Sequence, residues 1–177
     1  MKAAGLVLLL AACAGAAQIA ARPASADQTR LSLDVIRTLE RVFDNGLESV
    51  RPEPINVVGA TRGLYLPGYG LVFTAELDLT LTPVSGGMML RQITPAERAA
   101  IHDKKLAQLP VLEQLMRGMV TASARAADTL PDHERIVLAV RLWYQAFEDQ
   151  NGLPREILLS TDRKSALSGQ KLEVSSK

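Results

Sequence analysis

The sequence predicts an α+β domain: a mostly antiparallel sheet of four or five strands, built from two hairpins and packed with two to three helices. An amphipathic helical segment comes first, and a hairpin follows in which apolar and polar residues alternate. The same order, a helix and then a strand pair, is repeated in the second half of the chain. Segregated helices and strand pairs are typical of the α+β class, and residues 27–177 have the length of a single domain.

The first predicted element is a helix over residues 29–47, in which charged residues lie opposite an apolar face. The apolar face consists of Val35, Ile36, Leu39, Val42, Phe43 and Leu47. Asn45 and Gly46 are typical of a helix end. The segment 51–54, Arg-Pro-Glu-Pro, then predicts an extended linker, because a proline restricts both its own backbone and that of the residue before it.

Two strands joined by a tight turn follow. From Phe73 to Leu81 apolar residues alternate strictly with polar ones, so one face of this strand is expected in the core and the other in water. The run 55–66 is rich in β-branched residues and is the expected partner strand. Pro67 presets φ, and Gly68 and Gly70 tolerate positive φ, which predicts a hairpin turn between the two strands.

The second helical region begins after a connection, residues 82–92, which its Gly86-Gly87 pair indicates to be a flexible linker. Thr94 and Glu97 match a capping box, and the proline between them suits the first helical position. Pro110 is expected to break or kink the helix. Beyond it, apolar residues at helical spacing predict a face that packs in the core: Leu112, Leu115, Met116, Met119 and Val120.

The remaining segments predict a second strand pair. Residues 135–147 are apolar on both faces for much of their length, as a central strand is, and residues 155–161 form the returning strand. Asn151-Gly152 between them is a strong tight-turn signal. A single helical turn at 164–167 and a short edge strand at 171–174 complete the predicted fold.

Residues 1–26 have the three parts of an export signal: Lys2, an apolar stretch, and the small-x-small sequence that ends at Ala26. We therefore expect cleavage after Ala26 and a periplasmic or secreted chain that begins at Asp27. An alternative is lipid attachment, because Leu-Ala-Ala-Cys at 10–13 resembles the lipobox of bacterial lipoproteins, in which Cys13 would be acylated. The apolar run before Cys13 is short and no polar tether follows it, which favours cleavage after Ala26.

Charge and composition narrow the possible partners. Removal of Lys2 and Arg22 with the leader leaves 18 basic and 19 acidic residues, so neither nucleic acid nor an anionic membrane is an expected partner. Membrane attachment is expected only if Cys13 is lipidated. Because Cys13 is the single cysteine, a chain that begins at Asp27 has no disulfide and no thiol chemistry.

No segment matches a catalytic or metal-binding motif, so no catalytic residue, metal ligand or cofactor is predicted. His102 and His133 have no partner at the spacing of metal ligands. The acidic stretch 148–151 lacks the pattern of a calcium loop and is expected to be a turn. The chain also lacks Gly-x-Ser-x-Gly and the phosphate-binding glycine motif with its lysine.

The stretches GLYLPGYGLVFTAELDL and LAVRLWYQAFEDQNGLPREILLSTDRKSAL resemble segments of uncharacterised exported bacterial proteins, a family whose domain has no known function. The similarity covers the two hairpins. It implies an exported α+β protein, and it carries no catalytic residues that could be transferred to this chain.

Three function classes remain. We expect a non-catalytic protein of the cell envelope that binds a partner, an envelope protein or a small ligand, through a sheet edge or exposed aromatic residues. Tyr69, between two glycines at the hairpin tip, and Trp143 are the candidate binding residues. The alternatives are a small-ligand binder with a pocket between sheet and helices, and a hydrolase, for which the sequence supplies no set of catalytic residues. A concave pocket lined by His133, Glu134 and Arg141 would support the hydrolase, and a solid core would exclude it.

Overall fold

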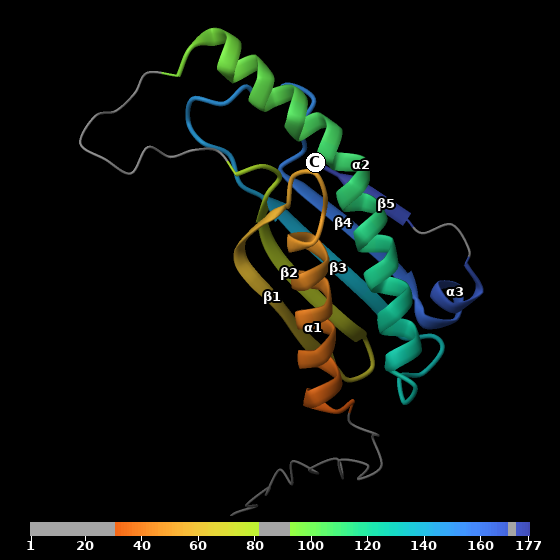
Figure 1. Ribbon diagram of the computed structural model, residues 1–177. Coiled ribbons are helices and arrows are strands. Elements are labelled where there is room, and N and C mark those ends of the chain that lie inside the picture. The colour runs from red at the N-terminus through yellow and green to blue at the C-terminus, as the bar shows by residue number, and fades with distance from the viewer. Residues whose placement is uncertain (1–30, 82–92, 170–172) are drawn as a thin grey trace, which may run out of the picture.

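In the computed structural model of the chain, a five-stranded sheet carries helices on one of its faces (Figure 1). The structure describes residues 31–81, 93–169 and 173–177. Three parts that figured in the sequence predictions lie outside these residues: the leader with Cys13 and Ala26, the connection 82–92, and residues 170–172. The described elements are α1 (Leu33–Glu48), β1 (Asn56–Leu66), β2 (Gly70–Asp78), α2 (Pro95–Ala126), β3 (Arg135–Leu142), β4 (Glu156–Asp162), α3 (Arg163–Ser168) and β5 (Glu173–Ser176).

The strands lie in the sheet in the order in which they occur in the chain, from β1 to β5. Three of the four neighbouring pairs are antiparallel, which confirms the predicted α+β class and its mostly antiparallel sheet. The pair formed by β2 and β3 is parallel. It joins the two hairpins, and α2 makes the crossover between them, because a chain must return to the same end of the sheet before it can form a parallel neighbour.

Helix α1 covers the outer edge of β1. The carboxylate of Glu40 accepts a hydrogen bond from the backbone N–H of Gly63 at 2.6 Å, and that of Asp44 accepts one from the N–H of Thr61 at 3.2 Å. Gly63 permits this close approach, since a Cβ at this position would lie 2.5 Å from a methyl carbon of Ile36. Backbone groups that an edge strand would leave open to another strand are thus occupied by α1.

Helix α2 is continuous through Pro110, so of the two outcomes expected there, a break or a kink, the break was wrong. The capping box at its start is present, with Thr94 and Glu97 bonding each other's backbone N–H groups. Side chains on both sides of the proline are buried, among them Lys105 and Leu112. A proline inside a helix costs about 3 kcal/mol, and burial on both sides outweighs this cost.

Two strands end earlier than the sequence predicted. β2 stops at Asp78 instead of Leu81, because the carboxylate of Asp78 accepts a hydrogen bond from the N–H of Thr80 and turns the chain. β3 stops at Leu142 instead of residue 147, and the turn at Asn151-Gly152 lies inside the longer connection to β4. Gly152 has a φ of +72°, as the turn signal predicts.

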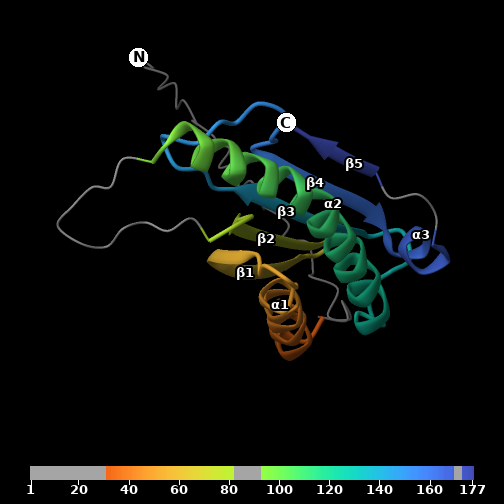
Figure 2. The same ribbon diagram turned by 45° about the horizontal axis from the view of Figure 1, so that its top comes forward.

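The alternation of side chains gives the sheet two different faces. One face is apolar and packs with α1, α2 and α3 into a single core, as the views in Figures 1 and 2 agree. Its fully buried members include Phe73 of β2, Leu138 of β3 and Leu159 of β4. We call the opposite face, on which none of the described helices packs, the open face.

Candidate functional site

Small side chains make the centre of the open face concave. A hollow of about 580 Å³ lies there, and it extends across β1, β2, β3 and β4 to the C-terminal residues of the chain. Gly59, Thr74 and Ala139 line it with little side-chain bulk, while longer side chains surround them. This part of the sheet is therefore recessed and accessible from solvent.

Apolar side chains are exposed on the same face. Leu64 and Leu66 of β1 and Leu158 of β4 are 58%, 41% and 41% exposed. Val72, which is half-buried, and Val137, which is buried, lie between Leu64 and Ser160 in one cross-strand row. An apolar surface of this kind, bordered by polar residues, is typical of an interaction site.

A row of charged residues crosses the open face. Glu76 of β2 lies beside Arg141 of β3, Arg141 lies beside Glu156 of β4, and the backbone of Glu156 exchanges two hydrogen bonds with that of Lys177. All four are exposed, and their charges alternate from one strand to the next. Arg141 Nη1 lies 3.7 Å from Glu76 Oε1, a solvated pair that contributes about 0–1 kcal/mol to stability. We call these four residues the charged row.

The two aromatic residues singled out in the sequence are both exposed, Tyr69 at 47% and Trp143 at 46%. They do not form one site. The carbonyl of Tyr69 accepts from the N–H of Arg135 where β3 begins, whereas the N–H of Trp143 donates to Leu77 just after β3 ends. The length of the strands separates them by roughly 25 Å.

Trp143 lies next to the open face, whereas Tyr69 lies at the opposite end of the sheet. A second hollow of about 520 Å³ lies beside Trp143, and it shares Arg141, Glu156 and Lys177 with the central hollow. Arg155 also lines it. The recessed surface thus runs continuously from the centre of the sheet, over the charged row, to an exposed indole.

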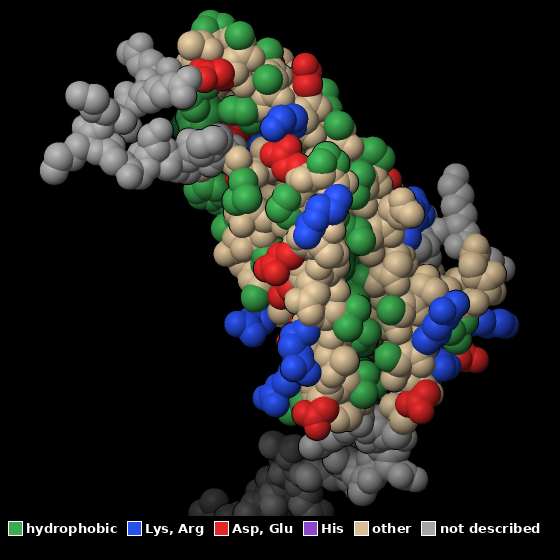
Figure 3. Space-filling model, in the orientation of Figure 1, with side chains coloured by type: hydrophobic (Ala, Val, Ile, Leu, Met, Phe, Trp, Pro, Cys, Tyr) green, Lys and Arg blue, Asp and Glu red, His purple; other side chains and the backbone are tan. Residues whose placement is uncertain are grey.

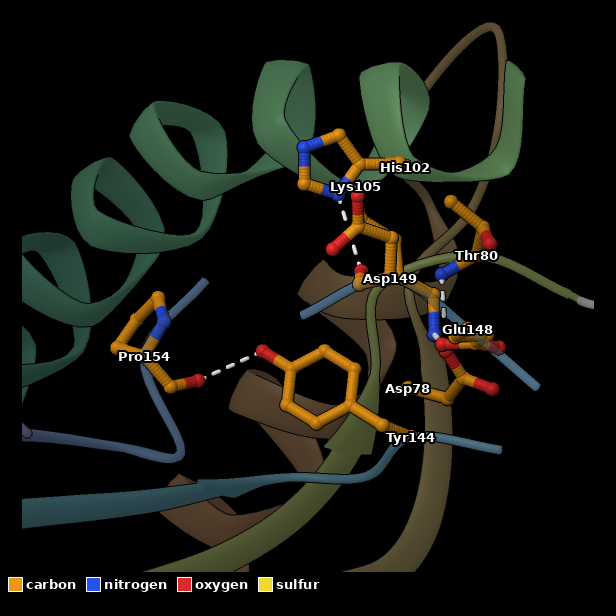
Figure 4. A network of polar contacts seen from close by, with 8 residues as sticks. All are labelled: Asp78, Thr80, His102, Lys105, Tyr144, Glu148, Asp149 and Pro154. Atoms are coloured by element: carbon orange, nitrogen blue, oxygen red, sulfur yellow. Dashed lines mark hydrogen bonds and ion pairs between the residues drawn. The ribbon is translucent and has the colours of Figure 1, made fainter. Parts of the chain in front are cut away.

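A buried ionic cluster lies at the same end of the molecule, beneath α2 (Figure 4). Lys105 is completely buried, and its Nζ lies 2.8 Å from Asp78 Oδ1 and 2.5 Å from Glu148 Oε2. The same Nζ lies 5.0 Å from the ring centre of Tyr144. Burial raises the pKa of the Tyr144 hydroxyl, with Glu148 and Asp78 adding to the effect, so this group stays protonated and donates to the carbonyl of Pro154 at 2.6 Å.

This cluster fastens three segments together: the end of β2, helix α2 and the connection between β3 and β4. His102 joins the same arrangement, since its Nδ1 lies 3.0 Å from the carbonyl oxygen of Asp149 and donates to it. The ammonium group has no solvent exposure with which to meet a substrate, so we assign the cluster a structural role.

Glu134 plays a similar part at the other end of the sheet. It is buried, and its Oε1 accepts from the N–H of Gly68 at 3.0 Å and lies 3.4 Å from the hydroxyl of Tyr65. Burial and the neighbouring Glu134 raise the pKa of the Tyr65 hydroxyl. Glu134 thus holds the β1–β2 turn against the start of β3.

The three residues whose common pocket would have supported a hydrolase do not meet. His133 and Glu134 precede β3, whereas Arg141 lies near its far end and lines the open face. Among the described residues, no group of three histidine, cysteine or acidic side chains is placed to hold a metal ion.

A groove also follows the seam between α1 and α2, where hydrophobic side chains gather on the surface in Figure 3. It measures about 540 Å³ and is lined by apolar residues such as Val42, Val111 and Leu115, with Arg51 among its few polar residues. It lies on the opposite side of the molecule from the charged row.

Comparison with known proteins leaves the geometry as the basis for any functional assignment. No protein-family model, no curated protein and no solved structure matches this chain. Within the part of the chain that the structure describes, none of the helices is long and apolar enough to cross a membrane.

Sequence reasoning located exposed aromatic residues but missed the charged row. Its members are far apart in the chain, and only the register of β2, β3 and β4 makes them neighbours. One signal was present: Thr74 and Glu76 belong to the polar half of the alternating strand, which places them on the face away from the core.

Proposed function

We propose that this protein is an exported, non-catalytic binding module that recognises a protein partner through the open face of its sheet. The observation that carries the proposal is the asymmetry of the sheet. The described helices pack on one face, while the other exposes leucines, a recessed centre and the charged row.

The shape of the open face favours a protein over a small molecule. Small-ligand sites are concave pockets that enclose most of the ligand, whereas this surface is a broad, shallow depression across four strands. Its apolar centre and charged border match the composition of a protein interface. A small ligand in the hollow beside Trp143 is the second candidate, because that hollow combines an exposed indole with basic side chains such as Arg155 and Lys177.

Export is the other half of the proposal. Its support is the leader sequence, together with the resemblance to exported bacterial proteins. We propose a mature chain that starts at Asp27 in the periplasm or outside the cell; a chain anchored through lipid on Cys13 is the alternative.

The test places a photo-crosslinking amino acid at one of two leucines in the full-length chain, expressed in a bacterium. Leu158 lies on the open face and is 41% exposed, while Leu167 of α3 is 44% exposed on the helical side and serves as the matched control. Irradiation of intact cells is expected to give a discrete protein adduct from position 158 and none from position 167.

The absence of an adduct at position 158, or equal adducts from both positions, would contradict the proposal. The intact mass of the same preparation reports on the leader, because cleavage after Ala26 leaves a chain that begins at Asp27. A membrane-bound species that Cys13→Ser releases or leaves unprocessed would instead establish the lipoprotein alternative.

A further inference from the structure

We infer that the partner recognised by the open face is a second copy of this chain, bound face to face about a twofold axis. The inference rests on the proposed function, since it names the partner of that same surface. Two independent features of the surface, its charge order and its side-chain sizes, carry it.

The charged row is complementary to itself when it is reversed. Read from β2 towards the C-terminal residue, the charges of Glu76, Arg141, Glu156 and Lys177 are negative, positive, negative and positive. A twofold axis parallel to the strands, placed between β3 and β4, lays this row over its own reverse. Each acidic residue then faces a basic one.

The contacts that this arrangement creates are specific. Arg141 faces Glu156 of the second copy, Glu76 faces Lys177, and the symmetry repeats both pairs. An alternating row with an odd number of charges would place like charges opposite each other at its ends, so the even number is what permits self-association. Stacked sheets lie about 10 Å apart, a distance that an arginine and a glutamate side chain can span together.

The next row of the open face agrees with the same axis. Its residues, from β2 to β5, are Thr74, Ala139, Leu158 and Ser175. Reversal places the exposed Leu158 of each copy over Ala139 of the other, at the recessed centre of the sheet. A large side chain thus meets a small one twice, and two small polar residues, Thr74 and Ser175, face each other.

The area that would be covered is small. The strands that overlap about this axis, β2 to β5, have nine, eight, seven and four residues. With neighbouring strands about 4.8 Å apart and a rise of about 3.3 Å per residue, they cover roughly 450 Å² on each copy. A total of about 900 Å² is in the range of weak, transient interfaces. We therefore expect a weak dimer that depends on ionic strength, because the charged row lies near the interface border.

The test exchanges charges between two variants of the exported protein. In the Arg141→Glu variant, the introduced glutamate faces Glu156 of the other copy, so two acidic side chains oppose each other at both symmetry-related contacts. In the Glu156→Arg variant, the introduced arginine faces Arg141 of the other copy, so two basic side chains oppose each other. Each variant alone is expected to dimerise at least about tenfold more weakly than the wild type, measured by sedimentation equilibrium.

A one-to-one mixture of the two variants is expected to form a heterodimer. At one contact the glutamate introduced at position 141 faces the arginine introduced at position 156 of the other copy. At the symmetry-related contact the unchanged Glu156 of the first variant faces the unchanged Arg141 of the second. Opposite charges therefore meet at both contacts in the mixture, and in neither variant alone.

The mixture makes the experiment independent of folding, because a variant that merely misfolded would not recover a partner. Arg37→Glu, an exposed charge reversal on α1, is the control and is expected to leave the wild-type dimer unchanged. Recovery in the mixture supports the inference. A mixture that stays monomeric, or a wild-type chain that stays monomeric at high concentration, overturns it.

The crosslinking experiment separates failure of this inference from failure of the proposed function. An adduct at position 158 with twice the mass of the chain supports both. An adduct with a different protein, together with a monomeric purified chain, keeps the proposed function and overturns the second copy as the partner. No adduct at that position and a monomeric chain contradict both.

Discussion

Replacement of Lys105 by methionine is expected to lower the free energy of unfolding by about 3–5 kcal/mol. The substitution removes the ammonium group that lies 2.8 Å from Asp78 and 2.5 Å from Glu148. Both carboxylates then stay buried without this positive charge beside them, and the energetic penalty of an uncompensated buried charge is large. Urea denaturation of the variant and the wild type measures the difference.

Two further variants show whether the charge is the cause. Lys104→Met alters the neighbouring lysine, whose ammonium group is solvated beside Glu53, and is expected to change stability by less than about 1 kcal/mol. The triple variant Lys105→Met/Asp78→Asn/Glu148→Gln removes all three charges and is expected to recover most of the loss. A triple variant as unstable as Lys105→Met would show that lost packing, and not the buried charge, causes the effect.

Replacement of Gly70 by alanine is expected to cost about 2–5 kcal/mol, through two effects that add. Gly70 has a φ of +138°, a conformation that residues with a Cβ rarely adopt. A Cβ there would also collide with the backbone carbonyl of Arg135, where the hairpin turn meets the start of β3. Thermal or urea denaturation gives the size of the loss.

Gly68 provides the matched control for Gly70. It belongs to the same turn and has a φ of +79°, but a Cβ there would meet nothing within 4 Å. Gly68→Ala is therefore expected to cost only the conformational term, about 1–2 kcal/mol. Equal losses at the two positions would mean that the close approach of Arg135 does not constrain this turn.

Local signals in the sequence were enough to predict most elements. The capping box at Thr94 fixed the start of α2, and the glycines beside Tyr69 marked the hairpin turn, because both depend only on neighbouring residues. Features that depend on contacts between distant segments could not be predicted. The parallel pairing of β2 with β3 and the continuity of α2 through Pro110 are of this second kind.

The same distinction between local signals and contacts of distant segments applies to the candidate site. The exposure of Tyr69 followed from its position at a turn between glycines, and the polar face of β2 followed from its alternation. The partners of Lys105 are remote in the chain, and a lysine within a polar helical stretch gives no sign of burial. The charged row likewise required the register between β2, β3 and β4, which no local signal specifies.

The proposed function requires that the open face is occupied in the cell. The most direct measurement compares thiol reactivity at two threonines, each replaced by cysteine: Thr74 on the open face and Thr38 on the exposed side of α1. We predict that the cysteine at position 74 reacts much more slowly in intact cells than in dilute purified protein, while the one at position 38 reacts equally in both. A cysteine at position 74 that reacts at the same rate in both preparations would contradict the account.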